Sequence, residues 1–234
     1  MIYYDHLPLD REILDALNKL SINYVFQPIF QADGETVFAH EALMRPTQMT
    51  VTELIDDYAK KGKLHVLEVA TFFGAMQEYQ LRGYNEQICM NSFPSECFTD
   101  SEQRAFTEYF GEINGLGIIE ILEYPYTSME ACEAKRRVSS ERNIWISIDD
   151  FGSGINDMGV VELYNSRIVK LDRHLISDIN KYSEKQERVK RLVLEFHSRG
   201  LLVIAEGVEQ KAEFDYLVGL GVDLFQGYYL ARPA

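Results

Sequence analysis

Short apolar segments rich in β-branched residues recur along this chain, and longer segments with apolar residues three and four positions apart lie between them. The short segments are typical of buried strands, and the longer ones are typical of amphipathic helices. Eight strands are predicted, at Tyr24–Ile29, Val37–Leu43, Ile88–Asn91, Ile118–Leu122, Ile144–Ile148, Arg167–Leu171, Leu201–Ala205 and Leu224–Tyr229.

Helical patterns separate most consecutive strands from the second strand onward. The segment Val51–Arg82 is long enough for two helices, with a break near Lys61 and Gly62. Further helices are predicted at Ser101–Phe110, Ser128–Ser140, Ser183–Gly200 and Lys211–Leu220. Alternating strands and helices indicate a parallel sheet, and eight such strands favour closure into a TIM-like (β/α)8 barrel.

The connection between the first two strands does not follow this pattern. Only Gln31–Thr36 joins them, and the segment contains Asp33-Gly34. A parallel crossover needs about a dozen residues or more, whereas Asp-Gly is a hairpin signal. The first strand is therefore predicted to run antiparallel to the second.

Length and charge narrow the classes of protein and partner. The 234 residues contain no linker, repeat or low-complexity segment, so residues 1–234 are predicted to form a single domain. The formal net charge of −14 argues against a nucleic acid polymer as partner, because a phosphate backbone requires a basic surface. A small anionic ligand is compatible with this charge, since local cations decide its binding.

Cysteine usage and hydropathy favour a cytoplasmic protein. Cys89, Cys97 and Cys132 form no CxxC pair, which indicates reduced thiols. The stretch Tyr3–Pro8 shows no secretory signal. No apolar run approaches the roughly 20 residues that a membrane-spanning helix needs.

Two adjacent carboxylates, Asp149 and Asp150, follow the apolar strand Ile144–Ile148 directly and precede Phe151-Gly152. Neighbouring carboxylates repel each other, and burying them costs several kcal/mol unless a positive group lies between them. A divalent cation with oxygen ligands would relieve both costs. A strand that ends in a turn is the alternative explanation, since Asp and Gly are common turn residues.

Polar residues also end or interrupt the other apolar strands. These positions are Glu41, Asn91, Glu120 with Glu123, Asp149 with Asp150, Lys170 with Asp172, Glu206 with Glu209, and Gln226. Any one of them could simply cap a strand, but seven strands in succession carry one. Because function in such barrels lies at the C-terminal ends of the strands, a ring of oxygen ligands at the barrel mouth is predicted.

The chemistry of this ring favours Mg²⁺, Mn²⁺ or Ca²⁺ over zinc, which usually binds Cys or His. The five histidines show no paired spacing, and His40, beside Glu41, should face the opposite side of its strand. So many acidic ligands could hold two cations. Such a pair suits in-line displacement at phosphorus by a metal-activated water, with Lys170 orienting the nucleophile or stabilising the phosphoryl charge.

In sequence order, these residues and their neighbours resemble the EAL domain, a family of bacterial cyclic di-GMP phosphodiesterases. The resemblance covers about Asn18 to Pro233. Its motifs are Phe26-Gln27-Pro28-Ile29, Glu41-Ala42-Leu43 with Arg45, Glu120-Ile121-Leu122-Glu123, Asp149-Asp150-Phe151-Gly152-Ser153-Gly154, Val169-Lys170-Leu171-Asp172, Ala205-Glu206-Gly207-Val208-Glu209 and Gln226-Gly227-Tyr228.

The resemblance implies a TIM-like barrel with an antiparallel first strand, hydrolysis of cyclic di-GMP to linear pGpG, and two Mg²⁺ or Mn²⁺ ions. One ion would be held by Glu41, Asn91, Glu120 and Asp149, and the other by Asp149 and Asp150 with Glu206 close by. Catalytic roles would fall to Glu41, Lys170, Asp150 and Glu206. The substrate would meet Gln27, Leu43, Arg45 and Gln226. Supporting positions behind the ligands would be Glu123, Asp172 and Glu209.

The segment Ile155–Met158 departs from the resemblance, because the family usually has an aromatic residue and two serines there. This change leaves a second hypothesis open, a catalytically silent receptor for cyclic di-GMP or a protein-interaction module. A third is an unrelated metal-dependent barrel that enolises its substrate with a Lys base. A homodimer and sensor or cyclase domains outside this chain also stay open.

Overall fold

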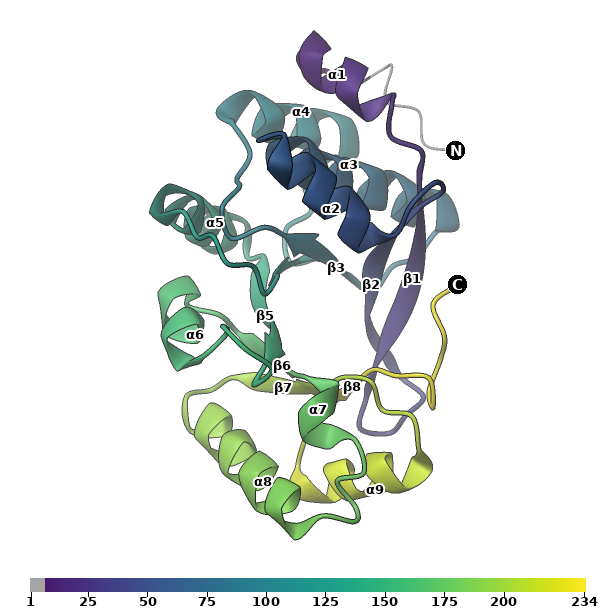
Figure 1. Ribbon diagram of the computed structural model, residues 1–234, viewed down its shortest axis with the longest axis vertical. Coiled ribbons are helices and arrows are strands. Elements are labelled where there is room, and N and C mark those ends of the chain that lie inside the picture. The colour runs from purple at the N-terminus through teal and green to yellow at the C-terminus, as the bar shows by residue number, and fades with distance from the viewer. Residues whose placement is uncertain (1–6) are drawn as a thin grey trace.

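The computed structural model describes residues 7–234, which form a closed barrel surrounded by helices (Figure 1). Residues 1–6 lie outside the described part, and so does most of the stretch Tyr3–Pro8 on which the prediction about a secretory signal rests. Within residues 7–234, no helix is long and apolar enough to span a membrane.

Eight strands follow one another around the barrel in sequence order, as predicted. They are β1 (Ile22–Gln31), β2 (Val37–Pro46), β3 (Gln87–Ser92), β4 (Gly117–Ile121), β5 (Trp145–Phe151), β6 (Ile168–Leu171), β7 (Leu202–Ala205) and β8 (Leu224–Phe225). All neighbouring pairs from β2 to β8 are parallel.

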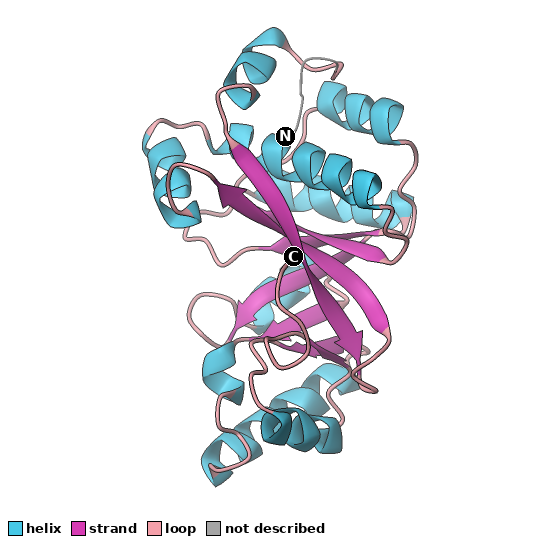
Figure 2. Ribbon diagram, turned by 90° about the vertical axis from the view of Figure 1, so that its right-hand side faces the viewer, coloured by secondary structure: helices cyan, strands magenta, loops and turns pink. Residues whose placement is uncertain are grey.

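The prediction of a reversed first strand is confirmed. β1 pairs antiparallel with both β2 and β8, and Gln27 lies opposite Glu41 in the register. The short connection is held by Asp33, whose carboxylate accepts hydrogen bonds from the backbone of Glu35 and Thr36. The last residue, Ala234, returns to pair with the backbone of Phe26 (Figure 2).

The helices lie outside the barrel, with α2, α3 and α4 on one side and α8 and α9 on the other (Figure 1). Those that the pattern predicts are α2 (Val51–Lys60), α3 (Leu64–Arg82), α4 (Asp100–Phe110), α5 (Met129–Arg142), α8 (Ser183–Ser198) and α9 (Lys211–Leu220). The sequence pattern did not predict three short helices, namely α1 (Arg11–Leu17), α6 (Met158–Tyr164) and α7 (Arg173–Ile176). Each is too short to show a clear helical period.

The structure corrects the ends of several predicted strands. β8 ends at Phe225 and not at Tyr229, because the chain turns at Gly227, where the backbone of Val208 leaves no room for a side chain. β2 runs beyond its predicted end at Leu43 to Pro46, through its long antiparallel pairing with β1. β5 runs beyond its predicted end at Ile148 to Phe151, so Asp149 and Asp150 lie within the strand and do not follow it.

Apolar side chains fill the N-terminal half of the barrel, and polar side chains lie above them. The lower layer contains Ile29, Ala39, Cys89, Ile118, Ile168, Ile204 and Leu224, each no more than 4% exposed. A larger apolar cluster packs the helices against the outside of the strands. The polar residues at the opposite end of the barrel therefore lie on a closely packed apolar layer.

His65 joins α3 to α4 and makes stability depend on pH. Its Nε2 lies 2.8 Å from Glu102 and its Nδ1 lies 3.7 Å from Glu96. The hydrogen bonds to these carboxylates raise the pKa of His65 from 6.5 to about 10. The protonated ring thus stabilises the fold fully below about pH 6.5, and this contribution is lost as pH rises toward 10.

We expect His65→Gln to lower the free energy of unfolding by about 1–2 kcal/mol at pH 7, a value reduced for partial solvent screening. The difference between the two proteins should shrink between pH 7 and pH 10. Urea unfolding at several pH values measures it. A difference independent of pH over this range would contradict the ion-pair explanation.

Candidate active site

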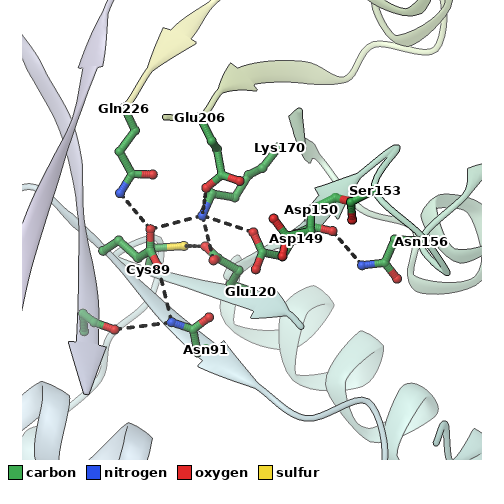
Figure 3. A network of polar contacts seen from close by, with 12 residues as sticks. Cys89, Asn91, Glu120, Asp149, Asp150, Ser153, Asn156, Lys170, Glu206 and Gln226 are labelled. Atoms are coloured by element: carbon green, nitrogen blue, oxygen red, sulfur yellow. Dashed lines mark hydrogen bonds and ion pairs between the residues drawn. The ribbon is translucent and has the colours of Figure 1, made fainter. Parts of the chain in front are cut away.

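Lys170 lies at the centre of the polar end of the barrel, 1% exposed, and four carboxylates surround its ammonium (Figure 3). Its Nζ lies 2.6 Å from Glu206, 2.7 Å from Glu120, 3.1 Å from Glu41 and 3.5 Å from Asp149. A single ammonium cannot neutralise four carboxylates, so the cluster carries excess negative charge when all four are ionised.

The pleat of the strands brings these residues together, because alternate side chains point into the barrel. Glu120 lies opposite Asn91 and Ser147 in the register of its two neighbouring strands, which places Asp149 one inward position beyond Ser147. Glu206 follows β7 directly, and its backbone N–H bonds to the carbonyl of Leu171. The fold thereby unites residues from five strands.

The pKa values in the cluster reflect this excess charge. Burial, together with the neighbouring carboxylates, raises the pKa of Glu120 and of Glu206 well above its usual range. Burial also opposes ionisation of Glu41, but Lys170 and the hydrogen bonds from Gln226 and Asn91 together lower its pKa. Burial would lower the pKa of Lys170, yet the surrounding carboxylates raise it well above its usual value.

Asp150 lies at the rim of the cluster and extends it. Oxygen atoms of Asp149, Asp150 and Glu206 lie within 4.8 Å of one another. Burial and the nearby carboxylates of Asp149 and Asp172 raise the pKa of Asp150 to about 7. This set of oxygen donors, together with its uncompensated charge, fits a hard divalent cation.

Two amide side chains complete the inner surface of the site. The Gln226 Nε2 donates to Glu41 Oε2 at 2.7 Å. The Asn91 Nδ2 lies 3.4 Å from both Glu41 Oε1 and the carbonyl of Ala42. Both amides orient Glu41, and Asn91 adds a side chain with oxygen-donor capacity beside the carboxylates.

A cleft of about 350 Å³ opens above the cluster and contains Gln27, Leu43 and Tyr228 in its walls. Gln27 also donates to the carbonyl of Ala231. Arg45 lies outside this cleft, in an adjacent hollow of about 200 Å³ that it shares with Glu41 and Asn91. Its exposed guanidinium bonds only to the carbonyl of Met44 among the described residues, so it is free to meet an anion.

The three predicted supporting residues occupy different places. Glu123 accepts hydrogen bonds from the hydroxyl of Ser153 and the backbone N–H of Ile155, so it holds the loop after Asp150. Asp172 caps α7 and lies close enough to Asp150 to raise its pKa. Glu209 pairs with Arg173 at 2.8 Å, and both residues lie in the wall of the cleft.

His40 faces away from the site, as predicted for the neighbour of Glu41, and stacks on Tyr84. The sequence did not predict two further contacts at the site. The Cys89 Sγ lies 2.7 Å from Glu120 Oε2, and the Asn156 Nδ2 lies 2.6 Å from the carbonyl of Asp149. The spacing of Cys89 two residues before Asn91 could have placed it inside the barrel, but no sequence pattern indicates the position of Asn156.

The sequence profile of the EAL domain family matches residues 10–233, and it therefore includes α1, which precedes Asn18. Among curated relatives, the bifunctional diguanylate cyclase/cyclic di-GMP phosphodiesterase MucR of Pseudomonas aeruginosa is 31% identical over 98% of this chain. The cyclic di-GMP phosphodiesterase PdeR of Escherichia coli is 24% identical, also over 98%. The chain spans only 35% and 36% of their respective lengths.

Solved structures share the same fold. A standalone versatile EAL protein from Vibrio cholerae O395, in its c-di-GMP-bound form, aligns with a TM-score of 0.81 and 24% identity over 92% of this chain and 93% of that one. The manganese/cy-diGMP complex of Klebsiella pneumoniae BlrP1 aligns with a TM-score of 0.79 and 23% identity over 92% and 57%. The match of the family profile over nearly the whole chain shows that this protein belongs to the EAL domain family.

Proposed function

We propose that this protein is a metal-dependent phosphodiesterase that hydrolyses cyclic di-GMP to linear pGpG. The observation that carries the proposal is the buried cluster of four carboxylates around Lys170, whose excess negative charge calls for bound cations. Membership of the EAL family and the names of the relatives MucR and PdeR support the substrate.

The proposal assigns two Mg²⁺ or Mn²⁺ ions to the two groups of ligands predicted from the sequence. The first group is Glu41, Asn91, Glu120 and Asp149, and the second is Asp149 and Asp150 with Glu206. The close approach of the last three carboxylates supports the second group. When bound, such cations lower the pKa of a coordinated water and draw charge from phosphoryl oxygens.

Side chains of this protein would orient the attacking water and the substrate. Lys170 stays protonated near neutral pH, because its pKa is raised, and it would donate a hydrogen bond to the attacking water or to a phosphoryl oxygen. Glu41, held by Gln226 and Lys170, has a fixed orientation. Arg45 would contact a phosphate, and Gln27 and Leu43 would contact a base. Attack of water would form a new P–O bond and break the P–O3′ bond of the ring. A proton would pass to the departing O3′, which leaves the linear, 5′-phosphorylated dinucleotide.

The experiment that tests the proposal incubates the protein with cyclic di-GMP and either Mg²⁺ or Mn²⁺, and follows pGpG by chromatography. We expect pGpG with metal, and no product after chelation with EDTA. Cyclic di-GMP bound but uncleaved with both metals would instead favour the silent receptor. Absence of nucleotide binding in calorimetry would contradict both functions.

The remaining expectations are part of the same proposal. We place the protein in the cytoplasm and treat residues 1–234 as one domain. Homodimerisation is to be measured by light scattering, and sensor or cyclase domains outside this chain would have to be sought in the gene.

A further inference from the structure

The backbone that carries Asp149 and Asp150 is irregular. β5 pairs with β6 through Ile148 and Val169, and again through Phe151 and Leu171. Asp149 and Asp150 together therefore face the single residue Lys170, which is the arrangement of a β-bulge. Asp150 has a φ of +49°, a left-handed conformation that is strained for a residue with a side chain.

The loop that follows this bulge folds back and holds it. The amide of Asn156 donates to the carbonyl of Asp149 at 2.6 Å, and the hydroxyl of Ser153 donates to the carbonyl of Asp150 at 2.8 Å (Figure 3). Asn156 is 6% exposed, so its hydrogen bond is shielded from water. Asn156 belongs to the segment that departs from the family pattern.

The next turn of the chain fixes Asn156 in place. Asp157 caps α6, and its side chain accepts a hydrogen bond from Val160. On the other side, Glu123 holds Ser153 and the backbone of Ile155. Asn156 thus lies between two segments that hydrogen bonds hold in place, which keeps its amide within reach of the carbonyl of Asp149.

We propose that Asn156 is a positioning residue that holds the bulge of β5 and thereby orients Asp149 and Asp150 as cation ligands. The inference rests on the proposed function for the presence of the cations. Without this donor the carbonyl of Asp149 would turn toward water, and the two adjacent carboxylates would lose their common orientation. Groups that orient metal ligands in this way typically change metal affinity by about 10–100-fold when removed.

Asn156→Ala and Asn156→Leu test the proposal, because both remove the donor and Leu keeps the branched shape and the number of side-chain heavy atoms without adding charge. Binding of Mn²⁺ alone, followed by electron paramagnetic resonance, should weaken by about tenfold or more in both variants. Asn85→Ala is the matched control. The Asn85 amide also reaches a backbone carbonyl, that of Gly83 at 3.4 Å, but it is exposed and lies between α3 and β3.

The thermal midpoint of the metal-free variants shows whether they are folded at the temperature of the titration. Hydrolysis by both variants should approach the wild-type rate at saturating Mn²⁺, with a raised half-saturating concentration, because only the affinity for the metal falls. A folded Asn156 variant that binds Mn²⁺ as the wild type does would overturn the proposal. Wild-type protein that binds Mn²⁺ without cleaving cyclic di-GMP would instead contradict the proposed function, while the Mn²⁺ titration would still decide the role of Asn156.

Discussion

Replacing Lys170 with methionine is expected to slow hydrolysis of cyclic di-GMP by on the order of 10³-fold, the upper range for one group that stabilises charge in a transition state. The ammonium of Lys170 contacts four carboxylates and is buried. Methionine keeps the length of the apolar stem but removes the positive charge at the centre of this cluster. The substrate would then lose a hydrogen-bond donor, and the carboxylates would repel one another.

Single-turnover kinetics with saturating Mn²⁺ measure this loss. Lys211→Met is the matched control, because Lys211 is exposed and pairs only with Asp215 in the described structure. Glu41→Gln removes a predicted ligand without changing the size of the side chain, and it should also abolish turnover. This variant tests the same cluster if Lys170→Met proves unstable. Wild-type turnover in either folded variant would rule out the assignment of this cluster as the catalytic site.

Replacing Lys135 with methionine is expected to lower the free energy of unfolding by about 3–5 kcal/mol, the typical cost of breaking a buried ion pair. Lys135 on α5 is 5% exposed, and its Nζ lies 3.6 Å from Glu68 on α3. It also donates to the carbonyls of Phe93 and Glu96. Removing the ammonium would leave the two carbonyls without this donor. It would also leave the Glu68 carboxylate buried without a counter-ion, although Ser92 and the backbone N–H of Phe93 would still donate to it.

Chemical unfolding in urea measures this cost. Lys211→Met serves again as control, because its exposed and solvent-screened ion pair with Asp215 should contribute little to stability. Burial already raises the pKa of Glu68, so an uncharged side chain should be easier to accommodate there. Adding Glu68→Gln to Lys135→Met should therefore recover part of the lost stability. A double variant less stable than Lys135→Met alone would show that the unpaired charge is not the cause.

Local patterns predicted much of the fold. The short connection around Asp33-Gly34 was enough to reverse the first strand, because six residues cannot form a parallel crossover. The break between α2 and α3 followed from Lys61-Gly62. β8 was overextended, because its early end depends on the contact of Gly227 with Val208, a residue from another part of the chain.

For the site, the sequence alone determined most of the residues that gather at the barrel mouth, since strands of period two place alternate side chains inside and family motifs mark them. No pattern indicated Asn156. Only the tertiary structure decided how they share their charge. Lys170 contacts Glu41, which lies 129 positions away in the sequence, and Asn156 donates a hydrogen bond to the carbonyl of Asp149 in the bulge of β5. Hydrogen bonds and ion pairs depend on distances of a few Å between separate segments, and these distances are set by packing, which leaves no periodic trace in the sequence.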